Sequence, residues 1–448
     1  MQQCTSSRSP ARAGTRAVRC LASAVAWLSP IAASWLSSPV AYAGNDDGVL
    51  VGGQAALAGG AVTATISDGT AAWYNPAGLA QLQRPSLDLN ASVYGFNWIS
   101  AQDLLTVPDG TQKGATVIDW VLLPSALSYS RVLSPRVVGS FGIFIPKTSD
   151  FTLQEYVADS QGTRWTVGFD RLQKEYDYIL TTAIRMSDTL RVGIALHGIY
   201  ISTEETTQIG AGNAGDDSAP FLVDTSHRTT GDYGLRIGLG VQWTPRADVD
   251  AGISLQTPTL TGLRQVSSSS LTASTADGGS PEFGSTSENG LKSVWELSTP
   301  LSVRAGIAFT RDRAQLLVDG TLTSSLESDE SVLSRNWHGN ARVACLWRVS
   351  DQLSSGMGVF SDLNATKEPA ANYIGVAGGV RLSSHYRIEE GARPLTFITT
   401  LGGRYAYGFG QIAGVRVSAE GESLTREEQA VTARAHELAF NLGWAVTF

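Results

Sequence analysis

Cysteine and long apolar runs are scarce in this chain of 448 residues. Two of its three cysteines, Cys4 and Cys20, lie among the first 20 residues, in a segment that we expect to be removed. Only Cys345 would then remain, so no internal disulfide can form. No apolar run reaches the roughly 20 residues that a spanning helix needs, and no Pro-rich or charged linker divides the chain. These absences exclude a disulfide scaffold and a helical membrane protein.

Motifs for catalysis and metal binding are also missing. The sequence has no Gly-x-Ser-x-Gly elbow, no paired metal ligands and no phosphate-binding glycine loop. Three of the five histidines, His197, His338 and His436, fall in segments of alternating polarity, where a polar lining residue is the simpler interpretation. We therefore expect no enzyme, no catalytic residue, no metal and no cofactor.

The first 43 residues have the organisation of an export signal. Four arginines (Arg8, Arg12, Arg16 and Arg19) precede a mostly apolar stretch, and Ala41-Tyr42-Ala43 forms a small-x-small cleavage site. We predict a signal peptide over residues 1–43 and a mature chain that starts at Gly44. Without the signal, 29 basic and 41 acidic residues give a net charge of −12, which argues against a nucleic-acid partner.

Segments of about ten residues that alternate apolar and polar side chains recur along the mature chain, which is typical of outer-membrane barrels. Between residues 248 and 257, for example, Ile253 and Leu255 alternate with Ser254 and Gln256. Short and long connections also alternate, as periplasmic turns and external loops do. The Ser/Gly-rich stretch Ser267–Asn289 is low in apolar residues, and we expect it to be a mobile external loop. We predict fourteen strands, at 86–99, 117–131, 136–146, 171–186, 189–203, 228–244, 248–257, 296–310, 313–325, 336–349, 353–361, 372–384, 394–410 and 431–448.

Aromatic residues lie near the ends of these segments, where the membrane interfaces of a barrel carry aromatic girdles. Trp243, Trp347 and Tyr373 are examples. The last segment alternates apolar and polar residues and ends on Phe448 itself. A terminal aromatic in this pattern resembles the signal by which the barrel-assembly machinery recognises its clients, so we expect that machinery as a partner through Phe448.

A compact Gly- and Ala-rich stretch, Asp68–Leu82, separates the export signal from the first strand. It contains Tyr74-Asn75-Pro76, followed by Gly78. Proline fixes its own φ and disfavours the α region for the residue before it, so Asn75-Pro76 predicts a locked turn rather than a helix interior. A small irregular plug followed by a barrel explains this order.

The same stretch resembles a known family. Gln54-Ala55-Ala56-Leu57-Ala58-Gly59-Gly60-Ala61, then Asp68, then Trp73-Tyr74-Asn75-Pro76-Ala77-Gly78-Leu79-Ala80, is similar to the N-terminal hatch of FadL-type outer-membrane transporters of long-chain fatty acids and aromatic hydrocarbons. The resemblance implies an all-β protein: a fourteen-stranded antiparallel barrel over residues 86–448, with residues 44–85 as a hatch in its lumen. Asp68, Tyr74, Asn75, Pro76 and Gly78 would be the hatch or gating residues.

The resemblance also implies a location and a function. We expect a monomeric, multi-pass barrel in the outer membrane, in contact with membrane lipids and lipopolysaccharide. It would take up a hydrophobic small molecule passively, most simply a long-chain fatty acid. In the family, ligand leaves through a gap at the third strand, and here that strand contains Gly139 and Gly142. Two alternatives stay open: a structural or secretion-associated barrel, and a lipid-hydrolysing barrel.

Charged residues at inward positions are the candidate ligand contacts. A carboxylate matches the planar fork of an arginine in two parallel hydrogen bonds, so one or two inward arginines could hold the head of a fatty acid. The alternative is a salt-bridged lumen that merely tolerates charge. The candidates are Arg191, Arg236, Arg304, Arg342 and Arg404.

Overall fold

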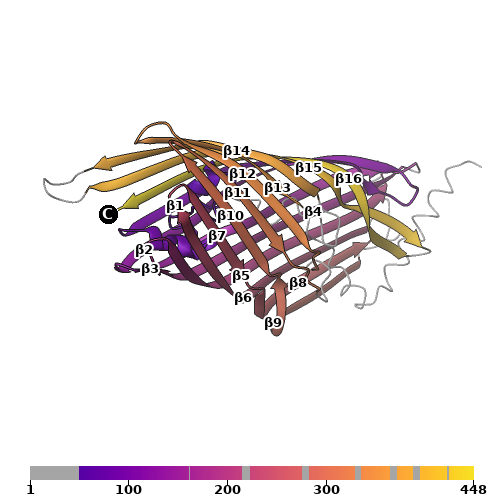
Figure 1. Ribbon diagram of the computed structural model, residues 1–448. Coiled ribbons are helices and arrows are strands. Elements are labelled where there is room, and N and C mark those ends of the chain that lie inside the picture. The colour runs from indigo at the N-terminus through magenta and orange to yellow at the C-terminus, as the bar shows by residue number, and fades with distance from the viewer. Residues whose placement is uncertain are drawn as a thin grey trace, which may run out of the picture.

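The computed structural model describes residues 50–160, 162–213, 222–274, 282–327, 334–363, 371–386, 394–420 and 423–448. They form one closed antiparallel β-barrel with a short helical segment at one end (Figure 1). The predicted signal peptide, residues 1–43, and the predicted start at Gly44 lie outside the described residues. No helix in the described ranges is long and apolar enough to cross a membrane.

The sheet contains sixteen strands in the described part of the chain. They are β1 (Ser86–Thr106), β2 (Gln112–Ser134), β3 (Val137–Ala158), β4 (Thr163–Arg185), β5 (Leu190–Asn213), β6 (Leu222–Arg246), β7 (Val249–Gln256), β8 (Thr259–Ser274), β9 (Glu282–Thr299), β10 (Ser302–Arg311), β11 (Ala314–Thr323), β12 (His338–Arg348), β13 (Leu353–Asp362), β14 (Ala371–Tyr386), β15 (Leu395–Glu420) and β16 (Ser423–Thr447).

Two pairs of these strands are continuous. β7 leads into β8 across Pro258, and β9 leads into β10 across Pro300. A proline has no amide hydrogen to give the ladder, so each pair is one long strand with a break in it. Counted in this way the wall has fourteen strands, which confirms the predicted fold class and strand number.

The wall closes because its first and last strands pair. Ser86 lies opposite Thr447, and Ala101 lies opposite Ala433. The barrel therefore starts and finishes at the edge that carries the short connections β2–β3, β4–β5, β6–β7, β10–β11 and β12–β13. We call this edge the turn end and the opposite edge the outer end. The C-terminus marks the turn end in Figure 1.

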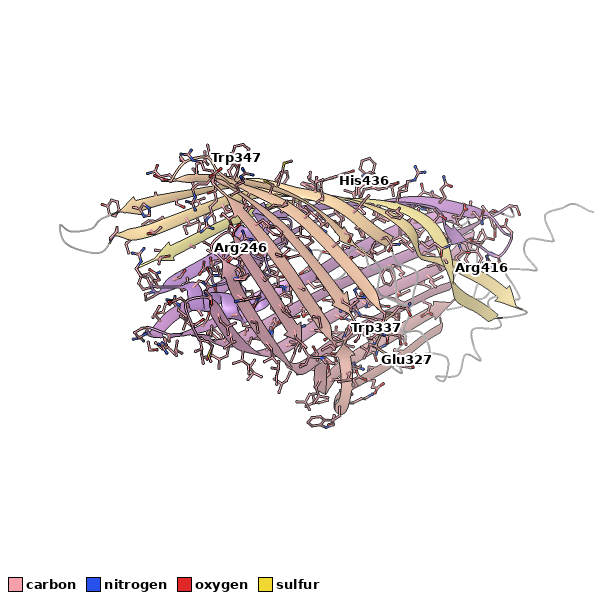
Figure 2. All side chains as sticks on the ribbon, in the orientation of Figure 1. Arg246, Glu327, Trp337, Trp347, Arg416 and His436 are labelled. Atoms are coloured by element: carbon pink, nitrogen blue, oxygen red, sulfur yellow. The ribbon has the colours of Figure 1, made fainter. Side chains whose placement is uncertain are left out.

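The outward face of the barrel is apolar, as predicted. Ile253 is 57% exposed, whereas Ser254, its neighbour on the inward face, is 3% exposed. Trp347 and His436 point away from the wall (Figure 2). Such an exposed apolar band on a closed barrel is characteristic of a multi-pass outer-membrane protein. Tyr373 was expected in an aromatic girdle, but it faces inward and is 1% exposed.

The strands extend further toward the outer end than predicted. Most of the predicted loop over residues 147–170 is strand, because β3 continues to Ala158 and β4 begins at Thr163. The stretch Ser267–Asn289, predicted to be a mobile loop, pairs within β8 and β9, with Ser268 opposite Glu288. That prediction was wrong because backbone pairing continues where the strand no longer needs apolar side chains for lipid; residues 275–281 lie outside the described ranges.

Residues 50–85 precede the first strand and are called the lumen segment from here. The segment contains α2 (Gly53–Leu57), α3 (Ala71–Tyr74) and the 3-10 helix η3 (Pro76–Gln81). Most of its residues are buried, among them Val51, Ile66 and Leu79, each with no exposed surface. It is rich in Gly and Ala, so its backbone can approach the wall closely.

Glycines of the wall make room for the lumen segment on both sides. A Cβ added to Gly193, Gly240 or Gly252 would lie within 2.4 Å of an atom of the segment. Across the barrel, a Cβ added to Gly356 or Gly402 would lie 2.7 Å from Leu57 O and 3.0 Å from Ala56 Cβ, respectively. The lumen segment therefore bridges the barrel from β5–β7 to β13–β15.

Candidate functional site

Buried apolar side chains gather inside the barrel between the lumen segment and the outer end. Because Leu50 is one of them, the first described residue of the lumen segment reaches this region. We call the set the outer apolar cluster. Its members are Leu50, Ile99, Ala101, Leu104, Leu105, Val107, Ala115, Val117, Phe151, Leu153, Val157, Trp165, Val167, Phe169, Phe360, Ala371, Tyr373, Ala377, Ala406, Ile412, Val415, Val417, Val431, Ala433 and Ala435.

The polarity of the two wall faces inverts toward the outer end. On β4, outward Leu180 is 60% exposed near the turn end, whereas Trp165, near the outer end, faces inward and is 2% exposed. On β3, Phe151 and Leu153 are buried while the residue after each is exposed. These residues alternate visibly in the sequence, but they were not predicted to line the interior. The prediction assigned the apolar residues of each alternating segment to the face that contacts lipid.

Two of the predicted arginines lie beneath the outer apolar cluster. Arg404 donates to Glu437 Oε2 at 2.9 Å, and its guanidinium lies 4.5 Å from the ring centroid of Phe360, a cluster member. Arg342 donates to a wall hydroxyl at 2.9 Å and lies against Gly60 of the lumen segment. Both side chains are almost fully buried. A charged floor therefore underlies an apolar interior.

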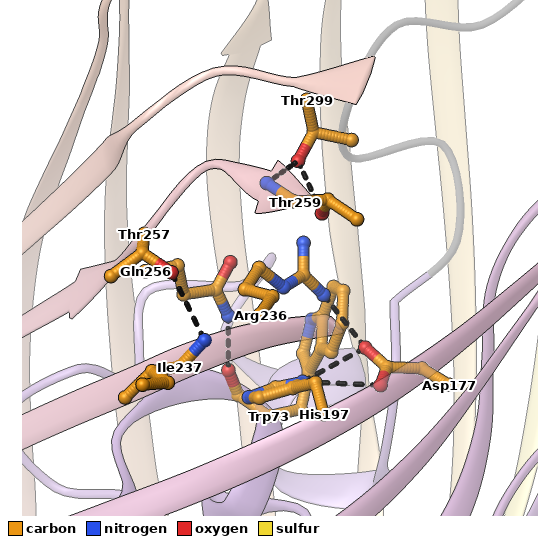
Figure 3. Close-up of polar contacts among 9 residues, drawn as sticks. All are labelled: Trp73, Asp177, His197, Arg236, Ile237, Gln256, Thr257, Thr259 and Thr299. Carbon is orange, nitrogen blue, oxygen red and sulfur yellow. Dashed lines mark hydrogen bonds and ion pairs between the residues drawn. The ribbon is translucent and has the colours of Figure 1, made fainter. Parts of the chain in front are cut away.

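A third arginine helps to hold the lumen segment (Figure 3). Arg236 donates to Asp177 Oδ2 at 2.7 Å, and the same carboxylate contacts His197 Nδ1 at 2.9 Å. The ring of Trp73 lies 5.2 Å from the Arg236 guanidinium and meets His197 edge-on at 6.2 Å. Gln256 donates to the Trp73 carbonyl at 3.0 Å. Strands β4 to β7 thus enclose Trp73 with polar groups.

The other two predicted arginines occupy different places. Arg304 lies 5.3 Å from the ring centroid of Tyr74, so it faces the lumen segment. Arg191 is near the turn end, where it donates to Thr244 Oγ1 at 3.4 Å. The five candidates do not converge on one site. Arg236 and Arg304 face the aromatic pair of the lumen segment, and only Arg342 and Arg404 adjoin the apolar interior.

His197 is not placed to activate a nucleophile in the part of the chain that is described. Nε2 of His197 is buried without a hydrogen-bond partner, so no hydroxyl is placed to act as its nucleophile. His338 Nδ1 contacts the carbonyl of Asn336 at 3.3 Å in an exposed position. Within the described residues, no group of three or more His, Cys, Asp or Glu could hold a metal ion.

Asn75 and Pro76 form the predicted turn. Asn75 is extended, with φ −156° and ψ 100°, and Pro76 starts η3. This confirms that the pair is not inside a helix. The Asn75 amide donates to Thr63 O at 2.9 Å and to Val241 O at 3.0 Å. It thereby ties two parts of the lumen segment to β6.

The other predicted hatch residues stabilise the lumen segment from within. Asp68 accepts from the Thr70 amide at 3.0 Å, and Gly78 leaves no room for a Cβ, which would lie 2.1 Å from Ile66 O. The Tyr74 hydroxyl accepts from the Val51 amide at 3.1 Å. Burial raises the pKa of Tyr74 to about 12, so the phenol stays neutral at physiological pH.

The backbone ladder between β2 and β3 covers only the half near the turn end. It runs from the turn to the pair Ala126–Phe144 and then stops, while β2 stays paired with β1 and β3 with β4. Pro124 and Pro146 lie just beyond the last pair and have no amide hydrogen to continue it. We call the unpaired stretch, 112–125 on β2 and 145–158 on β3, the seam.

Gly139 and Gly142, predicted to mark a lateral opening, lie below the seam. Gly139 is opposite Arg131 on β2 and Thr182 on β4, and Gly142 is also paired on both sides. The break in the ladder starts at Ile145, three residues after Gly142. That Gly139 and Gly142 mark a lateral opening stays a prediction; the ladder itself ends beside Pro124 and Pro146.

Comparisons with known proteins agree with this architecture. No family model matches the sequence, and no curated protein matches it. Solved structures do match, among them the following three. They are a FadL homologue of Pseudomonas aeruginosa (TM-score 0.53, 14% identity, 91% of this chain and 98% of that one), the toluene transporter TbuX of Ralstonia pickettii (0.51, 13%, 89% and 98%) and the toluene transporter TodX of P. putida (0.52, 10%, 90% and 99%). This chain therefore has the fold of the FadL-type outer-membrane transporters.

Proposed function

We propose that this protein takes up hydrophobic small molecules passively across the outer membrane. The observation that carries the proposal is the outer apolar cluster. A barrel for polar solutes has a polar, water-filled interior. Here the interior of the barrel is apolar at the outer end, and the lumen segment fills the interior nearer the turn end. Two of the similar structures are described as toluene transporters, which supports the same class of cargo.

The proposed route enters at the outer end and leaves sideways. A molecule held by the outer apolar cluster meets buried charges below it, at Arg342 and Arg404. Passing that floor would separate these charges from their partners, which is costly in a medium of low dielectric. The seam lies beside the outer apolar cluster, because the cluster includes Ala115 and Val117 of β2 and Phe151 of β3. Along the seam, the described structure records no backbone ladder between β2 and β3 that would have to break.

Long-chain fatty acids are the proposed cargo within this class. Arg342 and Arg404 lie at the boundary between the apolar cluster and the lumen segment. A fatty acid could place its chain among the cluster and its carboxylate at these guanidiniums, which match a carboxylate in geometry. Aromatic hydrocarbons would use the same interior without the arginines. The lumen segment is proposed to act as the hatch that prevents leakage along the axis.

Uptake by defined vesicles tests the proposal. The purified mature barrel is reconstituted, and the entry of a fluorescent fatty acid, of its methyl ester and of a small sugar is followed. We expect faster entry of both hydrophobic probes than in empty vesicles, with no entry of the sugar. Arg342→Gln should slow the acid relative to the ester. No acceleration of either probe would contradict the transport function and favour a structural or secretion-associated barrel.

A further inference from the structure

The seam is bridged at its outer end by two turns. The turn after β1 places Asp109 so that its carboxylate Oδ2 accepts from the Ser160 amide at 2.7 Å. Ser160 belongs to the turn after β3, so this contact joins the two sides of the seam. The amide of Thr111 also donates to Asp109, at 2.9 Å. These hydrogen bonds lower the pKa of Asp109 well below its usual range, so it is ionised near neutral pH.

A second bridge lies just below the first. Lys113 on β2 contacts Glu155 Oε2 on β3 at 3.5 Å and donates to the carbonyl of Tyr156 at 3.2 Å. Its ammonium also lies 4.9 Å from the Tyr156 ring centroid, and Arg164 of β4 lies over the same ring at 4.5 Å. One lysine therefore reaches across the seam to a carboxylate, a carbonyl and an aromatic ring.

Beside these bridges, the two sides of the seam also contribute apolar side chains to one buried group. Val107, just after β1, and Val157 and Trp165, on β3 and β4, belong to the same buried group. Apolar contacts of this kind are not directional and can re-form around an apolar ligand. The polar bridges are directional and partly exposed: the side chain of Lys113 is 38% exposed and that of Glu155 is 24% exposed. The bridges are therefore the directional contacts that join the two sides of the seam at its outer end.

We propose that Asp109, Lys113 and Glu155 form a latch that limits how far the seam parts and so sets the largest hydrophobic molecule that leaves sideways. The proposal rests on the proposed uptake function and specifies what determines its size limit. The pairing of the strands supports it, since backbone ladders with β1 and β4 hold the far side of each strand. Weakening the latch widens the seam without dismantling the barrel.

Charge reversal tests the latch. The variants are Lys113→Glu, Glu155→Lys and the double exchange, and the probes are a one-ring and a four-ring aromatic hydrocarbon. Each single reversal should raise the rate for the large probe relative to the small one by about two- to five-fold, the range that an exposed ion pair supports. The double exchange should restore the ratio. Lys292→Glu is the matched control, because Lys292 pairs with Glu288 on exposed β9, away from the seam.

A reversible cross-link tests the same latch from the opposite direction. Asp109→Cys and Ser160→Cys are introduced into a Cys345→Ala background, since Cys345 is the free, exposed cysteine of the described chain. Oxidation should slow the large probe more than the small one, and reduction should reverse the effect. An unchanged ratio in the charge variants and in the oxidised protein, with both probes entering wild-type vesicles, would overturn the latch alone. Failure of both probes to enter wild-type vesicles would overturn the uptake function as well.

Discussion

Gly240 and Gly193 offer a way to disturb the lumen segment from the wall without touching the segment itself. A Cβ on Gly240 would lie 2.1 Å from Asn75 Oδ1 and 2.7 Å from Pro76 Cδ, and one on Gly193 would lie 2.4 Å from the carbonyl carbon of Pro76. Ordinary contact at such a position begins near 3.4 Å. Either alanine therefore requires the Asn75-Pro76 turn to move by about 1 Å, because the wall is fixed by its ladders.

The magnitude follows from what that shift breaks. Overpacking of this kind costs about 1–3 kcal/mol. The shift also strains the two hydrogen bonds that Asn75 donates to Thr63 O and Val241 O, each worth about 1 kcal/mol. We expect Gly240→Ala to lower the free energy of unfolding by about 2–4 kcal/mol and to speed hydrogen exchange in the lumen segment. The wall ladders should keep their protection.

Gly198 on β5 is the matched control, because it lies on the same strand as Gly193. A Cβ there would have its nearest neighbour at 3.9 Å, which is ordinary contact. Gly198→Ala should be neutral or should stabilise by up to about 1 kcal/mol, since alanine restricts the unfolded chain. Urea unfolding in lipid vesicles measures all three variants. Equal midpoints for Gly240→Ala and Gly198→Ala would refute the idea that the wall holds the turn by close contact.

Four further predictions concern the turn, the membrane face and the buried polar groups. Replacing Asn75 and Pro76 with alanine should leave surface abundance unchanged but alter transport; leakage of small polar solutes would indicate a mechanical stopper, and unchanged uptake and permeability would contradict the hatch function. Ile253→Lys should cost about 2–4 kcal/mol of barrel stability, against little for Ile253→Leu, in heat-modifiability assays; equal stability would contradict the assigned face. Tyr74→Phe should cost about 1 kcal/mol and speed exchange of the Val51 amide; unchanged exchange would refute that contact. Arg236→Met should cost about 3–5 kcal/mol by removing the guanidinium that pairs with the buried Asp177 carboxylate, and an added Asp177→Asn should recover much of it; no recovery would show that the pairing is not the cause.

The strands near the turn end of the wall could be predicted from the sequence, whereas their continuation toward the outer end could not. Near the turn end, lipid requires apolar residues on one face, so a period of two marks strands such as β7 and β10. Beyond the bilayer that requirement stops, although backbone pairing continues. Ser267–Asn289 illustrates the difference: its serines looked like a loop, but most of the stretch lies in β8 and β9.

The candidate site was predictable by residue type but not by position. Four of the five arginines chosen by inward parity are buried, and Arg191 is half-buried, but parity does not say which side chain each one meets. Arg236 meets Asp177 and Trp73 because the lumen segment folds against β5 and β6, and the spacing of these residues in the sequence does not determine that contact. In the same way, Pro124 and Pro146 flank the end of a ladder only because β2 and β3 are neighbours, which their positions in the sequence do not show.

The inversion of polarity along the wall gives the proposed uptake a direction without an energy source. A hydrophobic molecule gains free energy when apolar surface leaves water, at roughly 25 cal/mol per Å². The outer apolar cluster offers such burial, and the hydrocarbon of the bilayer offers it again on the far side of the seam. The axial route offers the opposite, because Arg342 and Arg404 lie below the cluster with their partners and the lumen segment occupies the turn end. Each step that buries apolar surface leads sideways, and each step along the axis would expose it to buried charge. Passive transfer from the outside to the bilayer therefore requires only that β2 and β3 separate at the seam and close again once the molecule has passed.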